Sequence, residues 1–359
     1  MTKQKKTALH KNKGVSATEI TNKNAIEKLK AKRNKQLDSN ALVTAILNKD
    51  ITALSRAITL VESKNPNHLQ NAKNIIKACL PHANNSVRIG ITGVPGVGKS
   101  TFIETFGKYL TSQGKRVAVL AIDPSSSVSK GSILGDKTRM EALVKDENAY
   151  IRPSASGETL GGVARKTRET ITLCEAAGFN VIIIETVGVG QSETTVHSMV
   201  DFFLLLKLAG AGDELQGIKR GIIEMADAIA INKADGNNLH AAKLAKTEFT
   251  RALHFYPTKV SGWLPKVTTC SALNNEGINT IWDIILQYIK TTKANNYFNI
   301  KRNQQNKYWL IQTIETQLKS NFFNTPNIKA ELKNQLNLIE TNQTTPFAAA
   351  DVLLNMPKL

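Results

Sequence analysis

The sequence predicts an α/β fold in which a mostly parallel sheet carries helices on both faces. Within residues 87–290, short apolar runs rich in β-branched residues alternate with longer amphipathic segments, a pattern typical of parallel strands joined by crossover helices. The chain has 359 residues, of which 41% are hydrophobic. It is therefore long enough to bury a core, and a wholly disordered or a small disulfide-stapled protein is excluded.

Six apolar runs in this region have the length and composition of buried strands. We expect these strands at residues 88–92, 117–122, 181–185, 202–208, 228–232 and 267–270. The segments between them show helical spacing, with helices expected near residues 99–112, 160–177, 215–225 and 239–253. In such folds the loops at the carboxyl ends of the strands hold the ligand.

Helical segments are expected on both sides of this central domain. Residues 41–86 form a helical N-terminal extension, in which Pro66 separates two predicted helices. After Gly277 the pattern is helical again, with helices expected at residues 278–289, 301–318 and 328–339. The C-terminal segment, 291–359, is rich in aromatic residues that must cover something. Docking onto its own domain and pairing with a second copy both stay open, and we favour dimerisation because the chain extends past a complete domain.

The formal charge of +18 is concentrated at the two ends of the chain. Residues 1–40 carry 11 Lys or Arg against 3 Asp or Glu, and residues 287–359 carry 9 against 4. We expect a basic, disordered tail over residues 1–40. A solvated tail is favoured over a nucleic-acid arm because no aromatic residues interleave with the basic ones.

Composition also bears on the compartment. The longest apolar runs, such as residues 202–206, are far shorter than the roughly 20 residues of a membrane span. The three cysteines are scattered, and the Lys-rich start has no apolar segment of a secretory signal. We expect a cytoplasmic protein.

A phosphate-binding loop is the first motif that carries chemistry. Residues 93–100 match G-x-x-x-x-G-K-[ST] between a predicted strand and a predicted helix, which is the context that this motif requires. Glycines let backbone N–H groups turn inward around phosphate oxygens. Lys99 is expected to reach the phosphates and Ser100 to ligate Mg²⁺. The predicted loop comprises Gly93, Val94, Pro95, Gly96, Val97, Gly98, Lys99, Ser100 and Thr101. The predicted fold is therefore that of the P-loop NTPases.

A second motif selects the base. Asn232, Lys233 and Asp235 form N-K-x-D at the end of a predicted strand. An Asp carboxylate accepts hydrogen bonds from guanine N1–H and its exocyclic amine together, whereas adenine presents an acceptor at N1. The motif therefore predicts GTP or GDP as the bound nucleotide. Ser271, Ala272 and Leu273 follow the last predicted strand, where a backbone N–H is positioned to contact the guanine carbonyl.

Carboxylates are expected near the γ-phosphate. Glu185 ends the apolar run 181–184 in the manner of a Walker B acid, although an Asp is usual there. Asp123 ends the predicted strand 117–122, and a role as a turn or cap residue is an equally open interpretation.

The expected water-positioning residue is absent from its usual place. Val189 stands where a Gln would orient the attacking water, and Gln191 comes two residues later. We therefore expect slow intrinsic hydrolysis that a partner or a rearranged loop completes. Candidate mobile loops are residues 125–135, 188–193 and 210–221.

These motifs resemble the methylmalonyl-CoA mutase-associated GTPases, once described as arginine/ornithine transport kinases. The resemblance covers about residues 41–277. It rests on the phosphate loop, N-K-x-D and four longer strings: Asp123-Pro124-Ser125-Ser126, Gly135-Asp136-Lys137-Thr138-Arg139-Met140, Glu185-Thr186-Val187-Gly188-Val189-Gly190-Gln191-Ser192-Glu193 and Gly210-Ala211-Gly212-Asp213-Glu214-Leu215-Gln216-Gly217-Ile218-Lys219.

The resemblance implies a GTPase chaperone of the adenosylcobalamin-dependent methylmalonyl-CoA mutase, one that gates delivery or removal of the cofactor and protects the mutase from inactivation. It implies a homodimer formed through the C-terminal helices. Residues 212–221 would form a third switch, whose Lys219 enters the nucleotide site when the mutase is bound. With Lys99 and Asp123, Lys219 completes the expected catalytic group. The implied Mg²⁺ shell is Ser100, Asp123, Asp136 and Glu185.

Three other functions stay open as alternatives. A nickel metallochaperone GTPase needs Cys or His ligands at metal spacing, and only Cys79 and His82 come close. A small-molecule kinase would transfer phosphate to arginine or ornithine. RNA binding through residues 1–40 would be salt-sensitive.

Overall fold

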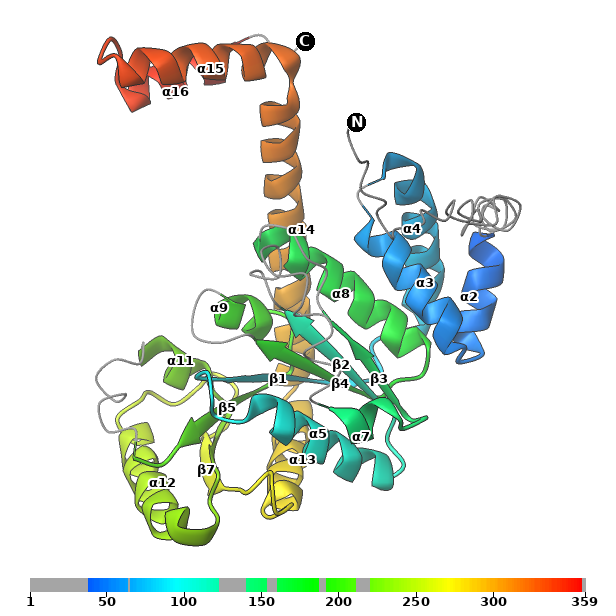
Figure 1. The fold of residues 1–359 in the computed structure, drawn as a ribbon, viewed down its shortest axis with the longest axis vertical. Coiled ribbons are helices and arrows are strands. Elements are labelled where there is room, and N and C mark those ends of the chain that lie inside the picture. The colour runs from blue at the N-terminus through cyan, green and yellow to red at the C-terminus, as the bar shows by residue number, and fades with distance from the viewer. Residues whose placement is uncertain are drawn as a thin grey trace, which may run out of the picture.

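The computed structural model describes residues 38–63, 65–122, 140–153, 160–186, 192–210 and 220–356 (Figure 1). Almost all of the predicted basic tail lies outside these residues, as does the water-positioning segment around Val189. Among the predicted site residues, Asp123, Asp136 and Lys219 lie outside them as well.

Parallel strands form one sheet of seven, which confirms the predicted fold class. The order is β3-β2-β4-β1-β5-β6-β7. Because β1 lies between β4 and β5, the loop that follows it opens at the point where the winding of the chain reverses, the usual ligand position of such sheets. The strands are β1 (Val87–Gly93), β2 (Val117–Ile122), β3 (Ala149–Arg152), β4 (Val181–Thr186), β5 (Phe202–Leu208), β6 (Ala228–Asn232) and β7 (Lys266–Thr269).

All six predicted strands are confirmed, and the described residues contain a seventh, β3, which does not stand out in the sequence. It is four residues long and lies at the edge of the sheet, and Tyr150 is its one buried residue. Such a strand has no continuous apolar run, so periodicity does not reveal it.

Helices cover both faces of the sheet (Figure 1). One face packs against α5 (Lys99–Ser112), α7 (Glu141–Val144) and α13 (Ile278–Ala294). The other packs against α8 (Leu160–Ala176), α9 (Ser192–His197), α11 (Arg220–Met225) and α12 (Leu239–Leu253). Of the helix predicted near residues 215–225, α11 is the described part.

In its described residues the N-terminal extension contains three α-helices, whereas the sequence predicts two. They are α2 (Ser39–Leu47), α3 (Ile51–Glu62) and α4 (Pro66–Cys79). The predicted break at Pro66 is confirmed, but a second break occurs at Lys49, whose φ is +68°. The Asp50 carboxylate then caps α3 by accepting the backbone N–H groups of Thr52 at 2.7 Å and Ala53 at 3.1 Å. The three helices share a hydrophobic core with α8.

The C-terminal segment leaves the body of the molecule. Figure 1 shows α14 (Tyr297–Asn324) rising from the body, with α15 (Pro326–Glu340) and α16 (Pro346–Leu354) across its far end. The sequence did not predict α16. The domain boundary predicted at residue 290 falls inside α13, which packs in the core of the central domain.

The first half of α14 is anchored at the amino end of β5. The Arg302 guanidinium donates to both carboxylate oxygens of the buried Asp201, at 2.8 and 2.7 Å. The Lys301 ammonium donates to the Asp201 carbonyl at 2.7 Å, and the Trp309 indole N–H donates to the Ser198 carbonyl at 3.2 Å. Docking onto its own domain thus accounts for part of the aromatic tail, whereas Leu310 and other apolar residues farther along α14 are exposed.

Candidate functional site

The predicted phosphate loop connects β1 to α5. Two of its glycines are required by space as well as by conformation. At Gly93 a Cβ atom would lie 2.6 Å from the Leu206 carbonyl oxygen of β5. At Gly98, whose φ is +90°, it would lie 3.0 Å from the Asn232 amide nitrogen. The loop therefore runs close against β5 and β6.

Lys99, the first residue of α5, turns back over this loop. Its ammonium donates to the Gly93 carbonyl at 2.8 Å, and Lys99 as a whole is only 9% exposed. Burial lowers the pKa of Lys99, and the charges of Glu185 and Glu193 act in the opposite direction. The cation thus lies against the start of the loop, and the charges of two buried carboxylates act on it.

Asn232 joins the base motif to the phosphate loop. It is the last residue of β6, and its amide nitrogen donates to the Val97 carbonyl at 2.8 Å. Its side-chain oxygen accepts the backbone N–H of Ala272 at 3.2 Å. The next residue, Lys233, donates to the Gly96 carbonyl at 2.9 Å. Three motifs that are far apart in the sequence are therefore hydrogen-bonded to one another.

Asp235 is oriented by the segment after β7. The Ser271 hydroxyl donates to its carboxylate, and the same hydroxyl accepts the backbone N–H of Asn274 at 3.1 Å. The Thr105 hydroxyl of α5 donates to the Ala272 carbonyl at 2.8 Å, which ties this segment to the phosphate side. Leu273, in contrast, is 81% exposed.

One of the two predicted strand-end acids, Glu185, acts through its charge on the Lys99 ammonium of the phosphate loop. Glu185 near the end of β4 pairs in register with Ile91 of β1 and is buried. Ser100 is half-buried in the first turn of α5. Within the described part of the chain, no cluster of three or more His, Cys, Asp or Glu residues suits a metal ion. Asp123 and Asp136 lie outside that part.

Two buried residues near these motifs escaped the sequence analysis as individual site candidates. Glu193 is fully buried in the first turn of α9. In the sequence it appeared only as the last residue of the predicted mobile loop 188–193 and of the family string that starts at Glu185. Cys270 donates its thiol to the Asn232 side-chain oxygen at 3.6 Å. Burial raises the pKa of Cys270 to about 12, so the thiol stays protonated and available as that donor.

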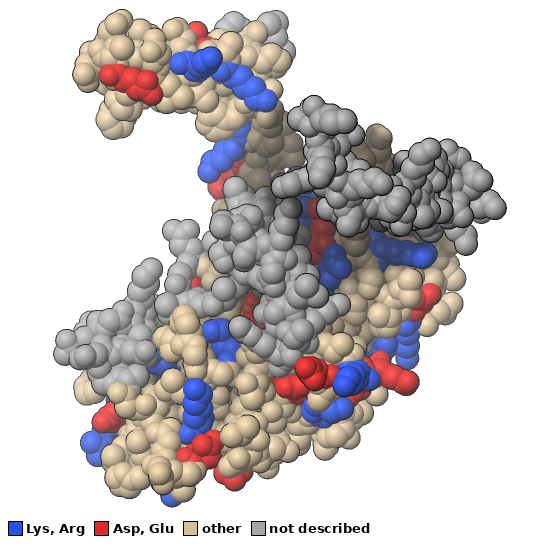
Figure 2. Space-filling model, viewed as in Figure 1, with Lys and Arg blue, Asp and Glu red and all other residues tan. Residues whose placement is uncertain are grey.

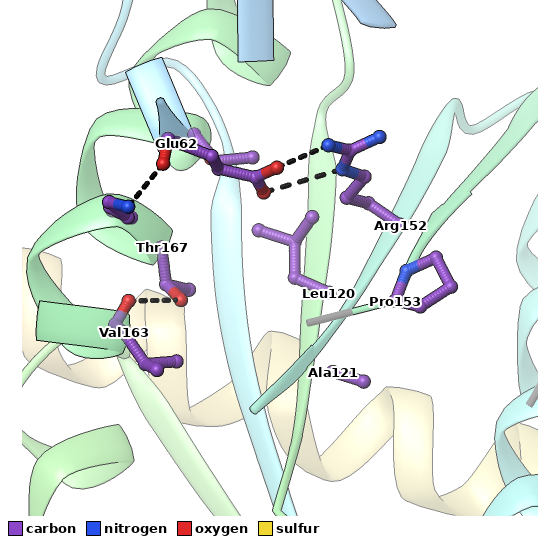
Figure 3. A pocket seen from close by; sticks show the side chains of 9 residues that line it. Glu62, Leu120, Ala121, Arg152, Pro153, Val163 and Thr167 are labelled. Atoms are coloured by element: carbon purple, nitrogen blue, oxygen red, sulfur yellow. Dashed lines mark hydrogen bonds and ion pairs between the residues drawn. The ribbon is translucent and has the colours of Figure 1, made fainter. Parts of the chain in front are cut away.

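Two described cavities lie away from these motifs. Figure 3 shows a small one, about 20 Å³, at the carboxyl ends of β2 and β3, where Arg152 pairs with the Glu62 carboxylate. Its volume suits about one water molecule. A larger groove of about 560 Å³ runs between α8 and α14. Neither includes a predicted nucleotide-binding residue.

The surface charges in Figure 2 are mixed. On this face, Lys and Arg side chains alternate with Asp and Glu, and no continuous basic stripe is visible among the coloured residues. The described residues on this face therefore do not form the continuous basic surface that is typical of a nucleic-acid interface.

Comparisons with known proteins agree with this geometry. The family model described as methylmalonyl Co-A mutase-associated GTPase matches residues 54–327. The chain is 45% identical over 320 residues to a Mycobacterium tuberculosis protein named as a probable GTPase, spanning 89% of this chain and 95% of the relative. It is 45% identical over 293 residues to the GTPase ArgK of Escherichia coli, spanning 82% of this chain and 88% of the relative.

A mammalian relative and a solved structure extend the comparison. The methylmalonic aciduria type A homolog of Mus musculus, described as mitochondrial, is 42% identical over 346 residues, with 94% of this chain and 83% of the relative covered. The crystal structure of an LAO/AO transport system kinase superposes with a TM-score of 0.70 at 36% identity, covering 88% of this chain and 96% of that one.

Proposed function

We propose that this chain, which belongs to the methylmalonyl-CoA mutase-associated GTPase family, uses its nucleotide cycle as a chaperone of an adenosylcobalamin-dependent methylmalonyl-CoA mutase. The chain is a GTPase. In the proposal, GTP binding and hydrolysis gate delivery or removal of the mutase cofactor and protect the mutase from inactivation. The observation that supports this most is the Asn232 bridge, because it assembles the phosphate loop and the guanine motif of such a switch into one site.

The residues described above suggest a division of roles. Lys99 would exchange its bond to the Gly93 carbonyl for the phosphates of the nucleotide, since a buried ammonium gains more from a phosphate anion than from a neutral carbonyl. Asp235, oriented by Ser271, would read guanine. Backbone groups of residues 93–101 and of Ser271, Ala272 and Leu273 would complete the nucleotide contacts.

Mg²⁺ is proposed on the chemistry of its donors. Ser100 and Glu185 supply the hydroxyl and carboxylate oxygens that Mg²⁺ prefers. Ser100 follows Lys99 in the first turn of α5, and the charge of Glu185 acts on the Lys99 ammonium. Asp123 and Asp136 are the other proposed donors. A bound Mg²⁺ would neutralise part of the phosphate charge. Around it, Lys99 and the backbone of the phosphate loop would hold the phosphates in place.

Stimulation of GTP hydrolysis by a partner is proposed because of the residue at the position that usually orients the attacking water. Val189 offers no amide to orient water, so the intrinsic rate is proposed to be slow. Lys219 and Asp123 are proposed to complete the catalytic group when the mutase binds.

The test is single-turnover GTP hydrolysis with and without the mutase. We expect the mutase to raise the rate of the unmodified protein. Lys219→Ala should keep the basal rate and lose the stimulated increment, while Lys243→Ala, an exposed lysine of α12, should keep both. No stimulation of the unmodified protein by any methylmalonyl-CoA mutase, together with no co-purification in either nucleotide state, would refute the proposed client.

A kinase activity is a second candidate, because the structure that this chain resembles is described as a transport system kinase. Transfer of labelled γ-phosphate from GTP or ATP to arginine or ornithine would support it. Release of the label only as inorganic phosphate would favour the switch.

We also propose a homodimer. The second half of α14 and the helices beyond it expose apolar side chains, among them Leu310, Leu318 and Phe347. Sedimentation of the full chain, compared with a variant carrying charged residues at these positions, tests this. No helix in the described residues is both long enough and apolar enough to cross a membrane, and a cytoplasmic location stays a proposal.

A further inference from the structure

We propose that Thr92 and Thr186 are a positioning pair that sets the spacing between Lys99 and Glu185. The inference deepens the proposed function, because it rests on the roles given to Lys99 and Glu185 there. Neither threonine is placed against the nucleotide. The pair acts by fixing two strands at the point where both leave the sheet for the phosphate end.

The two hydroxyls are in direct contact inside the protein. The Thr186 hydroxyl donates to the Thr92 hydroxyl oxygen at 2.9 Å. Thr186 is 0% exposed and Thr92 is 1% exposed. They follow Glu185 and Ile91, the last residues that pair between β4 and β1. The hydroxyl contact therefore extends the register of the two strands one step beyond their last pair.

The contact connects the strand that leads to Gly93 with the strand that carries Glu185. Thr92 is bonded through the chain to Gly93, whose carbonyl accepts the Lys99 ammonium. Thr186 is bonded through the chain to Glu185, whose charge acts on Lys99. A shift of β4 relative to β1 would thus change the distance between the Glu185 carboxylate and the ammonium. The hydroxyl pair opposes that shift.

The pair ties the strands from the face opposite Glu185. Side chains alternate along a strand, so Thr186 points away from the face on which Glu185 lies. Thr92 shares its face with Gly90, where an added Cβ would contact Phe203 and Val196. These are apolar neighbours on the α9 side of the sheet.

Packing alone does not call for hydroxyls here. Valine has nearly the shape of threonine and suits apolar neighbours, whereas a buried hydroxyl must recover its desolvation cost through a hydrogen bond. A hydrogen bond fixes the orientation of the two side chains relative to each other, which packing between valines does not. A direction-dependent link between the residue before the phosphate loop and the residue after Glu185 is what positioning requires.

The experiment compares Thr186→Val, Thr92→Val and the double variant with Thr186→Ser, which keeps the hydroxyl. The control is Thr292→Val, which removes another buried hydroxyl, one bonded within α13 at 2.8 Å. Three quantities are measured for each: the dissociation rate of a fluorescent GDP, the single-turnover rate of GTP hydrolysis, and the thermal midpoint.

We expect Thr186→Val to slow hydrolysis about tenfold and to speed GDP dissociation severalfold, in line with the effect of outer-shell positioning groups. The double variant should cost no more than either single valine change, because both remove the same link. Thr186→Ser and Thr292→Val should stay within about twofold of the unmodified protein.

Normal dissociation and hydrolysis in Thr186→Val would overturn the proposal, and so would equal impairment in Thr186→Ser. If one valine variant does not fold, the other decides, since both remove the same link. These measurements need no mutase, so they remain valid if the mutase proves not to be the partner of this protein. Absence of GDP binding by the unmodified protein would instead count against the nucleotide site itself.

Discussion

Replacing Asn232 by alanine tests the bridge between the base motif and the phosphate loop. The change removes the donor of the Val97 carbonyl and the acceptor of the Ala272 N–H, at 2.8 and 3.2 Å. Asn232 is 1% exposed, so water does not readily replace it. A buried polar group without a partner costs about 1–3 kcal/mol, so two such groups predict a loss of roughly 2–6 kcal/mol in the free energy of unfolding.

The assay is urea unfolding of the nucleotide-free protein, because these hydrogen bonds are present without nucleotide. The control is Asn238→Ala in the same loop, which loses a bond to the Lys233 carbonyl at 2.7 Å near the surface. Solvent can replace that bond, and a loss of no more than about 1 kcal/mol is expected.

A more specific variant separates the two sides of the bridge. Asn232→Asp keeps an acceptor for Ala272 but places an oxygen against the Val97 carbonyl oxygen. It should therefore be at least as destabilising as alanine. If Asn232→Ala loses no more stability than Asn238→Ala, the loops are held together by something other than this side chain, and the reasoning fails.

The remaining predictions concern affinity, selectivity and pH. Lys99→Ala should abolish measurable GTP binding in calorimetry, while binding by the Lys243→Ala control stays intact. Asp235→Asn should narrow the preference for GTP over ATP by about 1–3 kcal/mol in competition assays; an unchanged preference would contradict its role. Burial, helped by the charge of Lys301, lowers the pKa of His197 from 6.5 to about 4. The imidazole is therefore neutral in the fold, its contribution to stability is complete above pH 6.5, and about 3 kcal/mol is lost as the pH falls to 4. His197→Gln should remove that slope in chemical unfolding at a series of pH values, and a slope that persists would exclude His197 as its source.

Short sequence motifs predicted the loops of the site, because the backbone conformation of each loop depends on a few consecutive residues. The glycines at 93 and 98 and the N-K-x-D turn are requirements of a few consecutive residues. The structure places Gly93 at the end of β1, Gly98 at the start of α5 and Asn232 at the end of β6. The break at Lys49 is different: it has no Gly or Pro, and its one local signal is Asp50 as a cap. Composition alone does not separate such a cap from an ordinary helical Asp.

Contacts between residues far apart in the chain could not be predicted from the sequence. Asn232 and Val97 are separated by 135 residues, and Thr92 and Thr186 by 94. Their pairing depends on strand order and register, which follow from the whole sheet. The same limit applies to β3, since an edge strand of four residues is defined by its neighbour β2 more than by its own side chains.

The anchoring of α14 has a practical consequence for making a minimal fragment. A chain cut near residue 290, where composition suggests a boundary, would leave Asp201 buried without the guanidinium of Arg302. Stranding a buried charge in this way costs about 3–5 kcal/mol. A fragment intended for crystallisation or ligand screening should instead end beyond Trp309. Asp201 of the central domain then keeps its ion pair with Arg302, while the second half of α14 and the helices beyond it are removed.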